Sequence, residues 1–149
     1  MQKGLEIDMF GYQPEFVDCG DARIACYDVG RGKPLVLLHG NGEDSSYWNA
    51  QIPELTRFYR VIAVDSRGHG ASESGGHGLS FEQMASDLKT VLDARGVRKA
   101  HFLGFSDGGN LGTALRACLG FGLRDVAIVR PSFVRLSRHP RMEIARPPP

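Results

Sequence analysis

The residue with the clearest chemical meaning is Ser106, which lies in the sequence Gly104-Phe105-Ser106-Asp107-Gly108. This sequence matches G-x-S-x-G, the pattern of a nucleophile elbow, which is a sharp turn between a strand and a helix. Glycines two before and two after the serine avoid a collision between a Cβ atom and neighbouring backbone. The turn exposes the serine at the N-terminus of a helix, whose dipole favours negative charge. The pattern therefore predicts a nucleophilic serine, although a glycine-rich loop with an incidental serine would look the same.

Buried strands should position this turn. Residues 35–38 and 61–64 are uninterrupted apolar runs, which are typical of strands buried on both faces of a parallel sheet. A third short apolar run, residues 101–103, leads directly into the elbow. Two more strands are predicted over residues 16–17 and 24–29, and the loose apolar pattern of the second suggests a strand near the edge of the sheet.

Helical patterns alternate with these strands. Ser80 and Gln83 predict a capping box, in which the Ser80 hydroxyl accepts from the Gln83 amide and the Gln83 side chain reaches back to Ser80. Gly96 is the expected stop of that helix. A second helix is predicted around Pro53, and the loop from Gly70 to Gly78 is predicted to be a surface connection. The apolar face of the first helix comprises Phe81, Met84, Ala85, Leu88, Val91 and Leu92, and that of the second comprises Trp48, Ile52 and Leu55.

This order of elements predicts an α/β fold with a doubly wound, mostly parallel sheet and helices on both faces. The length of 149 residues, 42% of them hydrophobic, suits one domain with a core. Cys19, Cys26 and Cys118 are an odd, widely spaced set and are expected to be reduced thiols. The chain has no stretch typical of a signal peptide or a membrane span, so a cytoplasmic location is expected.

Three loops carry a resemblance to the α/β-hydrolase fold superfamily, in that family's order and at its approximate separations. They are His39-Gly40-Asn41-Gly42, Asp65-Ser66-Arg67-Gly68-His69-Gly70 and Gly104-Phe105-Ser106-Asp107-Gly108-Gly109. The resemblance covers residues 20–112 and implies that Ser106 is the nucleophile. It also implies an oxyanion hole formed by the backbone amides of Asn41 and Asp107. Two such donors, aimed at a developing negative oxygen, can each lower a barrier by about 3 kcal/mol.

The implied function is that of a serine hydrolase acting on a small ester, lactone, thioester or amide, with a small-molecule substrate and no metal or organic cofactor. The family's chain order also requires an acid and a histidine after the serine. His139 is the only histidine among the 43 residues that follow, and it lies in an Arg- and Pro-rich stretch. Asp125 and Glu143 are the remaining acids there, and neither follows a strand of the right order. The other four histidines have structural interpretations: His39, His69, His77 and His101.

The charge distribution sets the last part of the chain apart. The net charge is +1, yet residues 1–112 have 11 basic and 15 acidic residues, whereas residues 113–149 have seven and two. The seven basic residues are all arginines, and five of the eight prolines lie in the same stretch. We therefore expect residues 1–112 to be the N-terminal part of an α/β-hydrolase domain and residues 113–149 to be an atypical, partly disordered tail. A reading-frame change or a truncated gene would give such a tail, and the alternative is a real short variant with an unstructured basic tail. A chain so built should be aggregation-prone and nearly inactive.

Two alternatives belong to other functional classes. The run 35–38, followed by Gly40-x-Gly42, a helix and a strand ending in Asp65, imitates a dinucleotide-binding unit in which Asp65 would bind a ribose. Ser45 stands where that pattern has its third glycine, and the elbow stays unexplained. The second alternative is a non-catalytic fragment whose arginine-rich tail contacts an anionic surface. The tail has two isolated aromatic residues, Phe121 and Phe133, and no recognition motif, so binding to nucleic acid or membranes is not expected.

Overall fold

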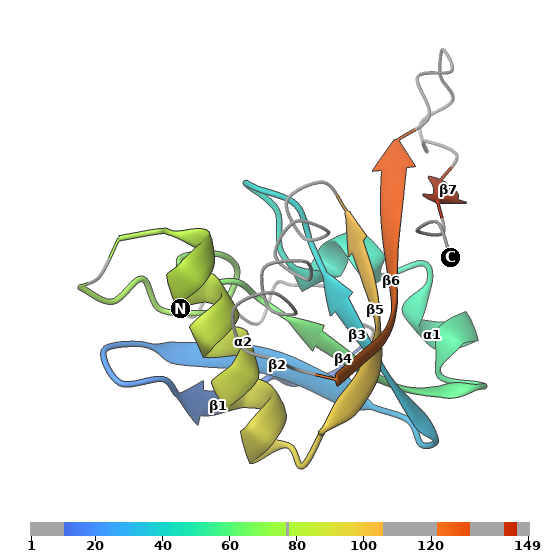
Figure 1. Ribbon diagram of the computed structural model, residues 1–149, viewed down its shortest axis with the longest axis horizontal. Coiled ribbons are helices and arrows are strands. Elements are labelled where there is room, and N and C mark those ends of the chain that lie inside the picture. Colours follow the sequence, from blue (N-terminus) through green and yellow to red (C-terminus); the bar gives the residue numbers. More distant parts are fainter. Residues whose placement is uncertain (1–10, 77, 106–121, 132–141, 146–149) are drawn as a thin grey trace.

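The computed structural model describes residues 11–76, 78–105, 122–131 and 142–145. Within these residues one sheet of seven strands forms, in the order β1-β2-β4-β3-β5-β6-β7 (Figure 1). The four central strands β4, β3, β5 and β6 run parallel, whereas β1, β2 and β7 pair antiparallel with their neighbours. The bounds are β1 Glu15–Asp18, β2 Arg23–Val29, β3 Lys33–Leu38, β4 Tyr59–Val64, β5 Lys99–Phe105, β6 Gly122–Pro131 and β7 Met142–Ala145. The predicted α/β fold is confirmed.

The apolar runs occupy the interior of the sheet, as their composition predicts. In β3 the four residues Leu35 to Leu38 are all buried, because β4 and β5 flank the strand and both of its faces are covered. β2 is one strand in from the edge, since only β1 lies outside it. Its residues Ile24 to Tyr27 are at most 2% exposed, so this strand is more deeply buried than its loose apolar pattern suggested.

One face of the sheet is covered by helix α2 (Phe81–Ala94). The Ser80 hydroxyl accepts from the Gln83 amide at 3.1 Å, as the capping box predicts. The second half of the box was predicted wrongly, because the Gln83 side chain donates to the Asp87 carboxylate at 3.0 Å. That carboxylate lies one turn further along the helix and is a stronger acceptor than a backbone group. Gly96, with φ +72°, follows the helix end as expected.

The opposite face is covered by two short helices, η2 (Ser45–Trp48) and α1 (Ile52–Leu55). The sequence predicts one continuous helix here, and this prediction was wrong. Pro53 lacks an amide hydrogen and sits in the first turn of α1, where a helix can begin but cannot be continued from an earlier one. Trp48 and Ile52 are nevertheless buried on the same side, as expected, and Leu55 packs against them.

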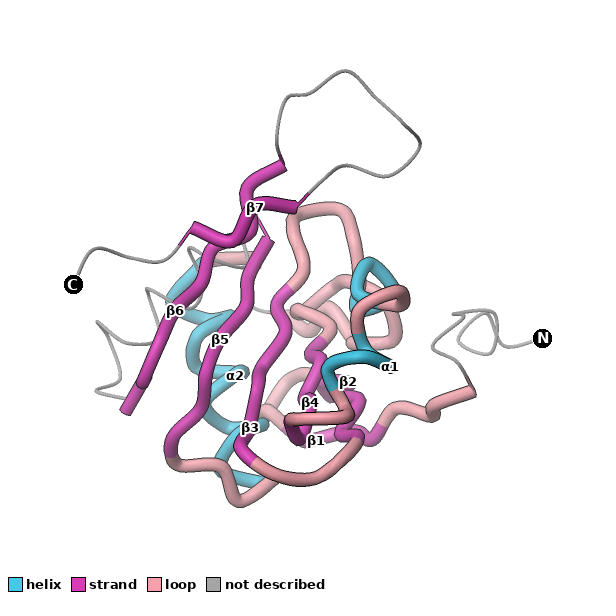
Figure 2. The backbone as a smooth tube through the Cα atoms, turned by 90° about the vertical axis from the view of Figure 1, so that its right-hand side faces the viewer, coloured by secondary structure: helices cyan, strands magenta, loops and turns pink. Residues whose placement is uncertain are grey.

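Alternation along each strand produces two separate apolar cores, and Figure 2 shows α2 and α1 on opposite sides of the strands. In β3, Val36 and Leu38 point into the α2 core, whereas Leu35 and Leu37 point into the other core. The α2 core also contains Ile24, Cys26, Ile62, Val64, Ala85, Leu88, Val91, Leu92 and Phe102. The opposite core contains Tyr27, Trp48, Ile52, Val61, Ala63 and Leu103.

Parts of the atypical tail are strands. Residues 122–131 form β6, which extends the parallel sheet beside β5. β7 pairs with β6 in antiparallel fashion and was not anticipated, because its four residues have no strand-like pattern that distinguishes them. Ser106, Asp107, Cys118 and His139 lie outside the described residues.

The two described cysteines are free thiols, as expected. Cys26 is buried and Cys19 is half-buried, and burial raises the pKa of each thiol to about 11. Both are therefore protonated and unreactive at neutral pH. Among the described residues, no helix has the length and apolar character needed to cross a membrane.

Candidate active site

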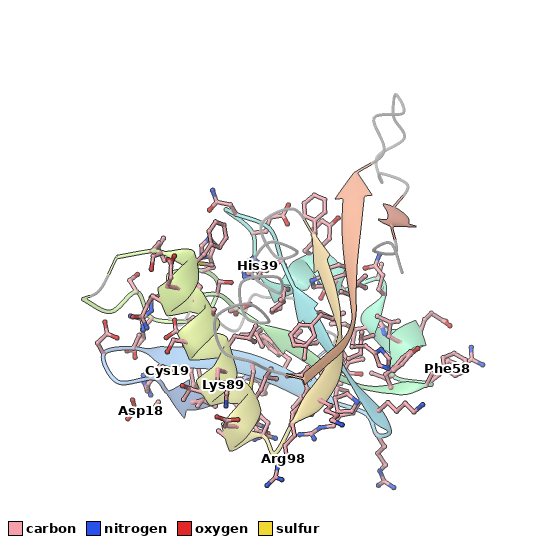
Figure 3. All side chains as sticks on the ribbon, viewed as in Figure 1. Asp18, Cys19, His39, Phe58, Lys89 and Arg98 are labelled. Atoms are coloured by element: carbon pink, nitrogen blue, oxygen red, sulfur yellow. The ribbon has the colours of Figure 1, made fainter. Side chains whose placement is uncertain are left out.

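The carboxyl ends of three parallel strands meet at one edge of the sheet. Leu38, the last residue of β3, pairs with Gly104 in β5 and with Val64, the last residue of β4. The loops that follow these strands therefore begin side by side. Figure 3 labels His39 at this edge, whereas Arg98, just before β5, lies at the opposite edge. In parallel α/β sheets this carboxyl edge is where ligands bind.

Gly40 brings the first loop into contact with the end of β5. A Cβ atom on Gly40 would lie 3.0 Å from the Phe105 ring and 3.3 Å from the Phe105 carbonyl oxygen. Gly40 is not one of the glycines with a positive φ. A glycine is needed here because the loop approaches Phe105 closely. Ser106 is the next residue after Phe105 in the chain. The loop that carries Asn41 is thus packed against the residue that precedes the predicted nucleophile.

A cavity of about 540 Å³ opens at the same edge. Its described lining divides into a polar wall from the loops after β3 and β4, which includes Asn41, and an apolar wall from the start of α2. Leu79 and Phe81, on the apolar wall, are 60% and 41% exposed. The lining residues are His39, Gly40, Asn41, Ser66, His69, Leu79, Ser80, Phe81, Glu82 and Met84. The cavity can take an organic molecule with a polar group at one side and an apolar group at the other.

Two histidines connect the loops after β3 and β4. The Nε2 atom of His39 lies 3.0 Å from the Ser66 amide nitrogen, and the Nε2 atom of His69 lies 3.2 Å from the Gly42 amide nitrogen. Burial lowers the pKa of His39 below its ordinary value, so its ring is neutral at neutral pH. The ring centroids are 5.2 Å apart. The structural interpretation of both histidines fits these contacts.

Asp65 also joins the same two loops through hydrogen bonds. Its carboxylate is fully buried and accepts from the backbone amides of Ser45, at 2.8 Å, and Ala71, at 3.0 Å. Both carboxylate oxygens are therefore engaged within the protein. Gly70 is required beside this carboxylate, because a Cβ atom there would lie 2.4 Å from Oδ2. This arrangement does not suit the ribose-binding role that the dinucleotide-binding alternative assigned to Asp65.

Arg67 fixes the second loop to the rest of the domain, and the sequence analysis missed it. Its guanidinium is fully buried and forms paired hydrogen bonds with Asp87 in α2, at 2.8 and 2.9 Å. It also donates to Asp21, in the turn between β1 and β2, at 2.8 Å. A signal was present, because Asp87 is a charged residue directly beside the apolar positions of an otherwise regular helix face.

Tyr47 also lies close to the end of β5, and Glu43 lies near Tyr47. The Tyr47 ring stacks on the Phe105 ring, with centroids 4.5 Å apart. Burial raises the pKa of Glu43 above its ordinary range, and burial also raises that of Tyr47, with a further contribution from Glu43. The stack supports Phe105 from the side opposite α2. Tyr47 has no sequence signal, since its role depends on contact with a strand far along the chain.

The remaining candidates fall in different places. His101 lies inside β5 beside the Tyr59 ring. Asp125 pairs with His101 in register and is therefore four positions short of the carboxyl edge, whereas Glu143 pairs with Arg130 near the end of β6. The described part of the chain holds no cluster of three or more His, Cys, Asp or Glu side chains that could bind a metal.

Comparisons with known proteins agree with this architecture. A family model described as alpha/beta hydrolase fold matches residues 33–117, which is more than half of the chain. A fluoroacetate dehalogenase from Burkholderia sp is 35% identical over 107 residues, 68% of this chain and 35% of that protein. A putative carbamate hydrolase, RutD, from Azorhizobium caulinodans is 36% identical over 110 residues, 74% of this chain and 42% of that protein.

Solved structures give the same picture. Est816, described as an N-acyl homoserine lactone degrading enzyme, superposes with a TM-score of 0.72 and 30% identity over 79% of this chain and 45% of its own. A hydrolase from Pseudomonas aeruginosa superposes with a TM-score of 0.71 and 32% identity over 82% of this chain and 48% of its own. The chain thus spans between about a third and a half of the length of these proteins. On the family match and the shared architecture, this chain belongs to the α/β-hydrolase fold family.

Proposed function

We propose that the chain carries the nucleophile and the oxyanion hole of a serine hydrolase. In this proposal Ser106 is the nucleophile, and the backbone amides of Asn41 and Asp107 stabilise the oxyanion. The observation that carries the proposal is the contact between Gly40 and Phe105, because it sets the Asn41 loop against the residue before Ser106. The position at the carboxyl edge and the adjoining cavity support it further.

The proposed chemistry is acyl transfer. The Ser106 hydroxyl oxygen attacks the substrate carbonyl carbon while a base takes its proton, and the carbonyl oxygen gains negative charge between the two amides. Collapse of this intermediate expels the alcohol, thiol or amine, which takes up a proton, and leaves an acyl ester on Ser106. Water then releases the acid and restores the serine. Small esters, lactones, thioesters and amides all fit this sequence.

The names of the relatives support hydrolysis as the general activity, but they do not agree on one substrate. The dehalogenase, the carbamate hydrolase and the lactone-degrading enzyme are named for different bonds. A hydroxyl nucleophile favours acyl substrates for this chain. The apolar wall of the cavity, with Phe81 and Leu79, favours a substrate with an apolar acyl or leaving group.

The 149 residues alone should turn over slowly. These residues offer no clear base, since His139 is the only histidine among the 43 that follow Ser106 and lies among arginines and prolines. Loss of the base of a serine triad removes on the order of 10⁶-fold in rate, and the oxyanion hole retains about 10³-fold over water. Without a base, deacylation is slow as well, so an acyl group transferred to Ser106 should accumulate.

Accumulation makes the proposal testable by mass spectrometry. The purified chain is incubated with 4-nitrophenyl butyrate, with and without added imidazole as an external base, and the acylated peptides are mapped. We expect a butyryl group on Ser106, formed faster with imidazole and absent in Ser106→Ala. Ser86→Ala is the matched control, because Ser86 is an exposed serine on α2. Acylation spread over several serines, with no preference for Ser106, would refute the proposal.

A further inference from the structure

The loop that carries Asn41 is held at both ends by hydrogen bonds that involve histidines. His39 contacts the carbonyl oxygen of Gly40, the residue before Asn41, and His69 contacts the amide of Gly42, the residue after it. We propose that His39 and His69 are reciprocal positioning residues that fix the Asn41 amide, and that each does so as the neutral tautomer with its proton on Nδ1. The link to the oxyanion hole depends on the proposed function, whereas the tautomers do not.

The geometry of His39 allows only this tautomer. Its Nδ1 atom lies 2.7 Å from the Gly40 carbonyl oxygen, which can only accept, so Nδ1 must donate. Its Nε2 atom lies 3.0 Å from the Ser66 amide, which can only donate, so Nε2 must accept. A proton on Nε2 would point at the amide hydrogen of Ser66, so that two N–H groups would face each other. His39 is 3% exposed, so water cannot replace a lost bond.

His69 repeats the arrangement in the other direction. Its Nδ1 atom lies 2.9 Å from the Arg67 carbonyl oxygen, and its Nε2 atom lies 3.2 Å from the Gly42 amide. Each histidine therefore donates to a carbonyl of its own loop and accepts from an amide of the other loop. Arg67 is itself anchored by Asp87 and Asp21, so the second loop provides a fixed support for the first.

The same contacts exclude a different role for these side chains. A general base needs a free nitrogen lone pair directed at the proton it removes. The lone pair on Nε2 of each ring is occupied by a backbone amide, and the other nitrogen carries the proton. Neither histidine can thus act as the base for Ser106 while the loops keep this arrangement. Both lie on the polar wall of the cavity as part of its frame.

The tautomers can be observed directly. Magic-angle-spinning NMR of the chain labelled with ¹⁵N-histidine distinguishes a protonated from an unprotonated ring nitrogen and does not require a monodisperse sample. We expect two rings with Nδ1 protonated and Nε2 unprotonated at pH 7.5, and their signals should disappear in His39→Gln and His69→Gln respectively. A proton on Nε2 of either ring would overturn the proposal.

The positioning role is tested by two substitutions of His69. The side-chain oxygen of glutamine can take the place of Nε2 as an acceptor, whereas methionine fills similar space without a good acceptor. We expect His69→Met to increase amide hydrogen exchange in the peptide that contains Gly42 by about tenfold and to slow Ser106 acylation by a similar factor. His69→Gln should restore most of both. His101→Gln, in β5, is the control that should change neither.

The two readouts separate this inference from the proposed function. If Ser106 is not acylated in any variant but the Gly42 exchange responds as expected, the proposed function fails and the loop contacts stand. If His69→Met leaves both the exchange and the acylation unchanged, the positioning role is refuted. If methionine and glutamine cause equal losses, the ring serves as packing only, and the proposal is refuted as well.

Discussion

The two faces of the sheet are covered in different ways. The α2 face has one helix of 14 residues, and its buried charged groups, Arg67 and Asp87, form two hydrogen bonds with each other and further ones with Asp21 and Gln83. The opposite face has two helices of four residues each. Several of its buried polar atoms have no hydrogen-bond partner within the described part of the chain: Tyr27 Oη, Ser45 Oγ, Trp48 Nε1, Asn49 Oδ1 and Gln51 Oε1.

This difference indicates that the arrangement of side chains is more tightly constrained on the α2 face than on the opposite face. A buried ion pair with all its hydrogen bonds made admits one arrangement, because any displacement leaves a charge unpaired. Unpartnered buried groups have no such requirement and can be removed at little cost. The α2 face supports the loop after β4, and this loop supports the Asn41 loop. We therefore expect substitutions on the α2 face to have the larger effects on stability.

The largest effect is expected for Arg67→Met, which leaves Asp87 buried without its cation. Removal of one partner of a buried pair costs about 3–5 kcal/mol in the free energy of unfolding. Trp48, the only tryptophan and fully buried, reports unfolding in urea by its fluorescence. Arg57→Met is the control, because Arg57 is 67% exposed in its pair with Glu54. Equal stability of the two variants would show that the buried ion pair contributes no more than the exposed one.

The second effect is a pH dependence of the free energy of unfolding, and it arises from His39, which joins the loops after β3 and β4. Burial depresses the pKa of His39 below its ordinary value of 6.5, so the folded chain binds fewer protons than the unfolded chain. The contribution of His39 is therefore fully present above pH 6.5 and is lost as the pH falls below it, until the folded pKa is reached. The slope can reach about 1.4 kcal/mol per pH unit. Urea unfolding at pH 7.5, 6.5 and 5.5 should show a weaker slope in His39→Gln than in the unmodified chain.

The third substitution is expected to leave the free energy of unfolding unchanged or to raise it. Tyr27→Phe removes a buried hydroxyl that has no partner among the described residues, with almost no change of shape. The free energy of unfolding should stay equal or rise by up to about 1 kcal/mol. A loss of more than about 1 kcal/mol would show that the hydroxyl is bonded and that the opposite face is as well specified as the α2 face.

The smallest effect is expected on the exposed side of α2. Lys89 and Asp93 form a pair one turn apart, at 2.6 Å, with side chains 35% and 56% exposed. Such pairs contribute about 0.3–0.5 kcal/mol, and salt screens them. Lys89→Ala should therefore lower stability only slightly, and less at 1 M salt. A loss comparable to that of Arg67→Met would mean that surface charge, and not burial, sets the difference between the faces.

The α2 face was predictable from the sequence because its signals are local. Ser80 marks the start of the helix, Gly96 marks its end, and the apolar residues between them repeat at helical spacing. On the opposite face, Pro53 splits the predicted helix, and the pattern of Trp48 and Ile52 fits two short helices equally well. Spacing alone could not decide between them.

The site was predictable only in outline. Asn41 was singled out by the resemblance of three loops to the α/β-hydrolases, and the structure places it in the lining of the cavity. The contacts that hold its loop join residues far apart in sequence, such as Gly42 with His69 and Arg67 with Asp87. Each partner looks unremarkable in its own segment. Their pairing follows from strand order, because β3 and β4 end beside each other.

The central claim is that the Asn41 loop and the end of β5 form one oxyanion site, and the most direct test is the rate of Ser106 acylation in Gly40→Ala. Its new methyl group would collide with Phe105, at 3.0 Å from the ring and 3.3 Å from the carbonyl oxygen, and would displace the loop. Gly76→Ala is the control, since a Cβ atom there meets nothing within 4 Å. Loss of one oxyanion donor lowers rates by about 10²–10³-fold. We expect such a loss for Gly40→Ala and no change for Gly76→Ala; acylation of Ser106 in Gly40→Ala at the unmodified rate would contradict the account.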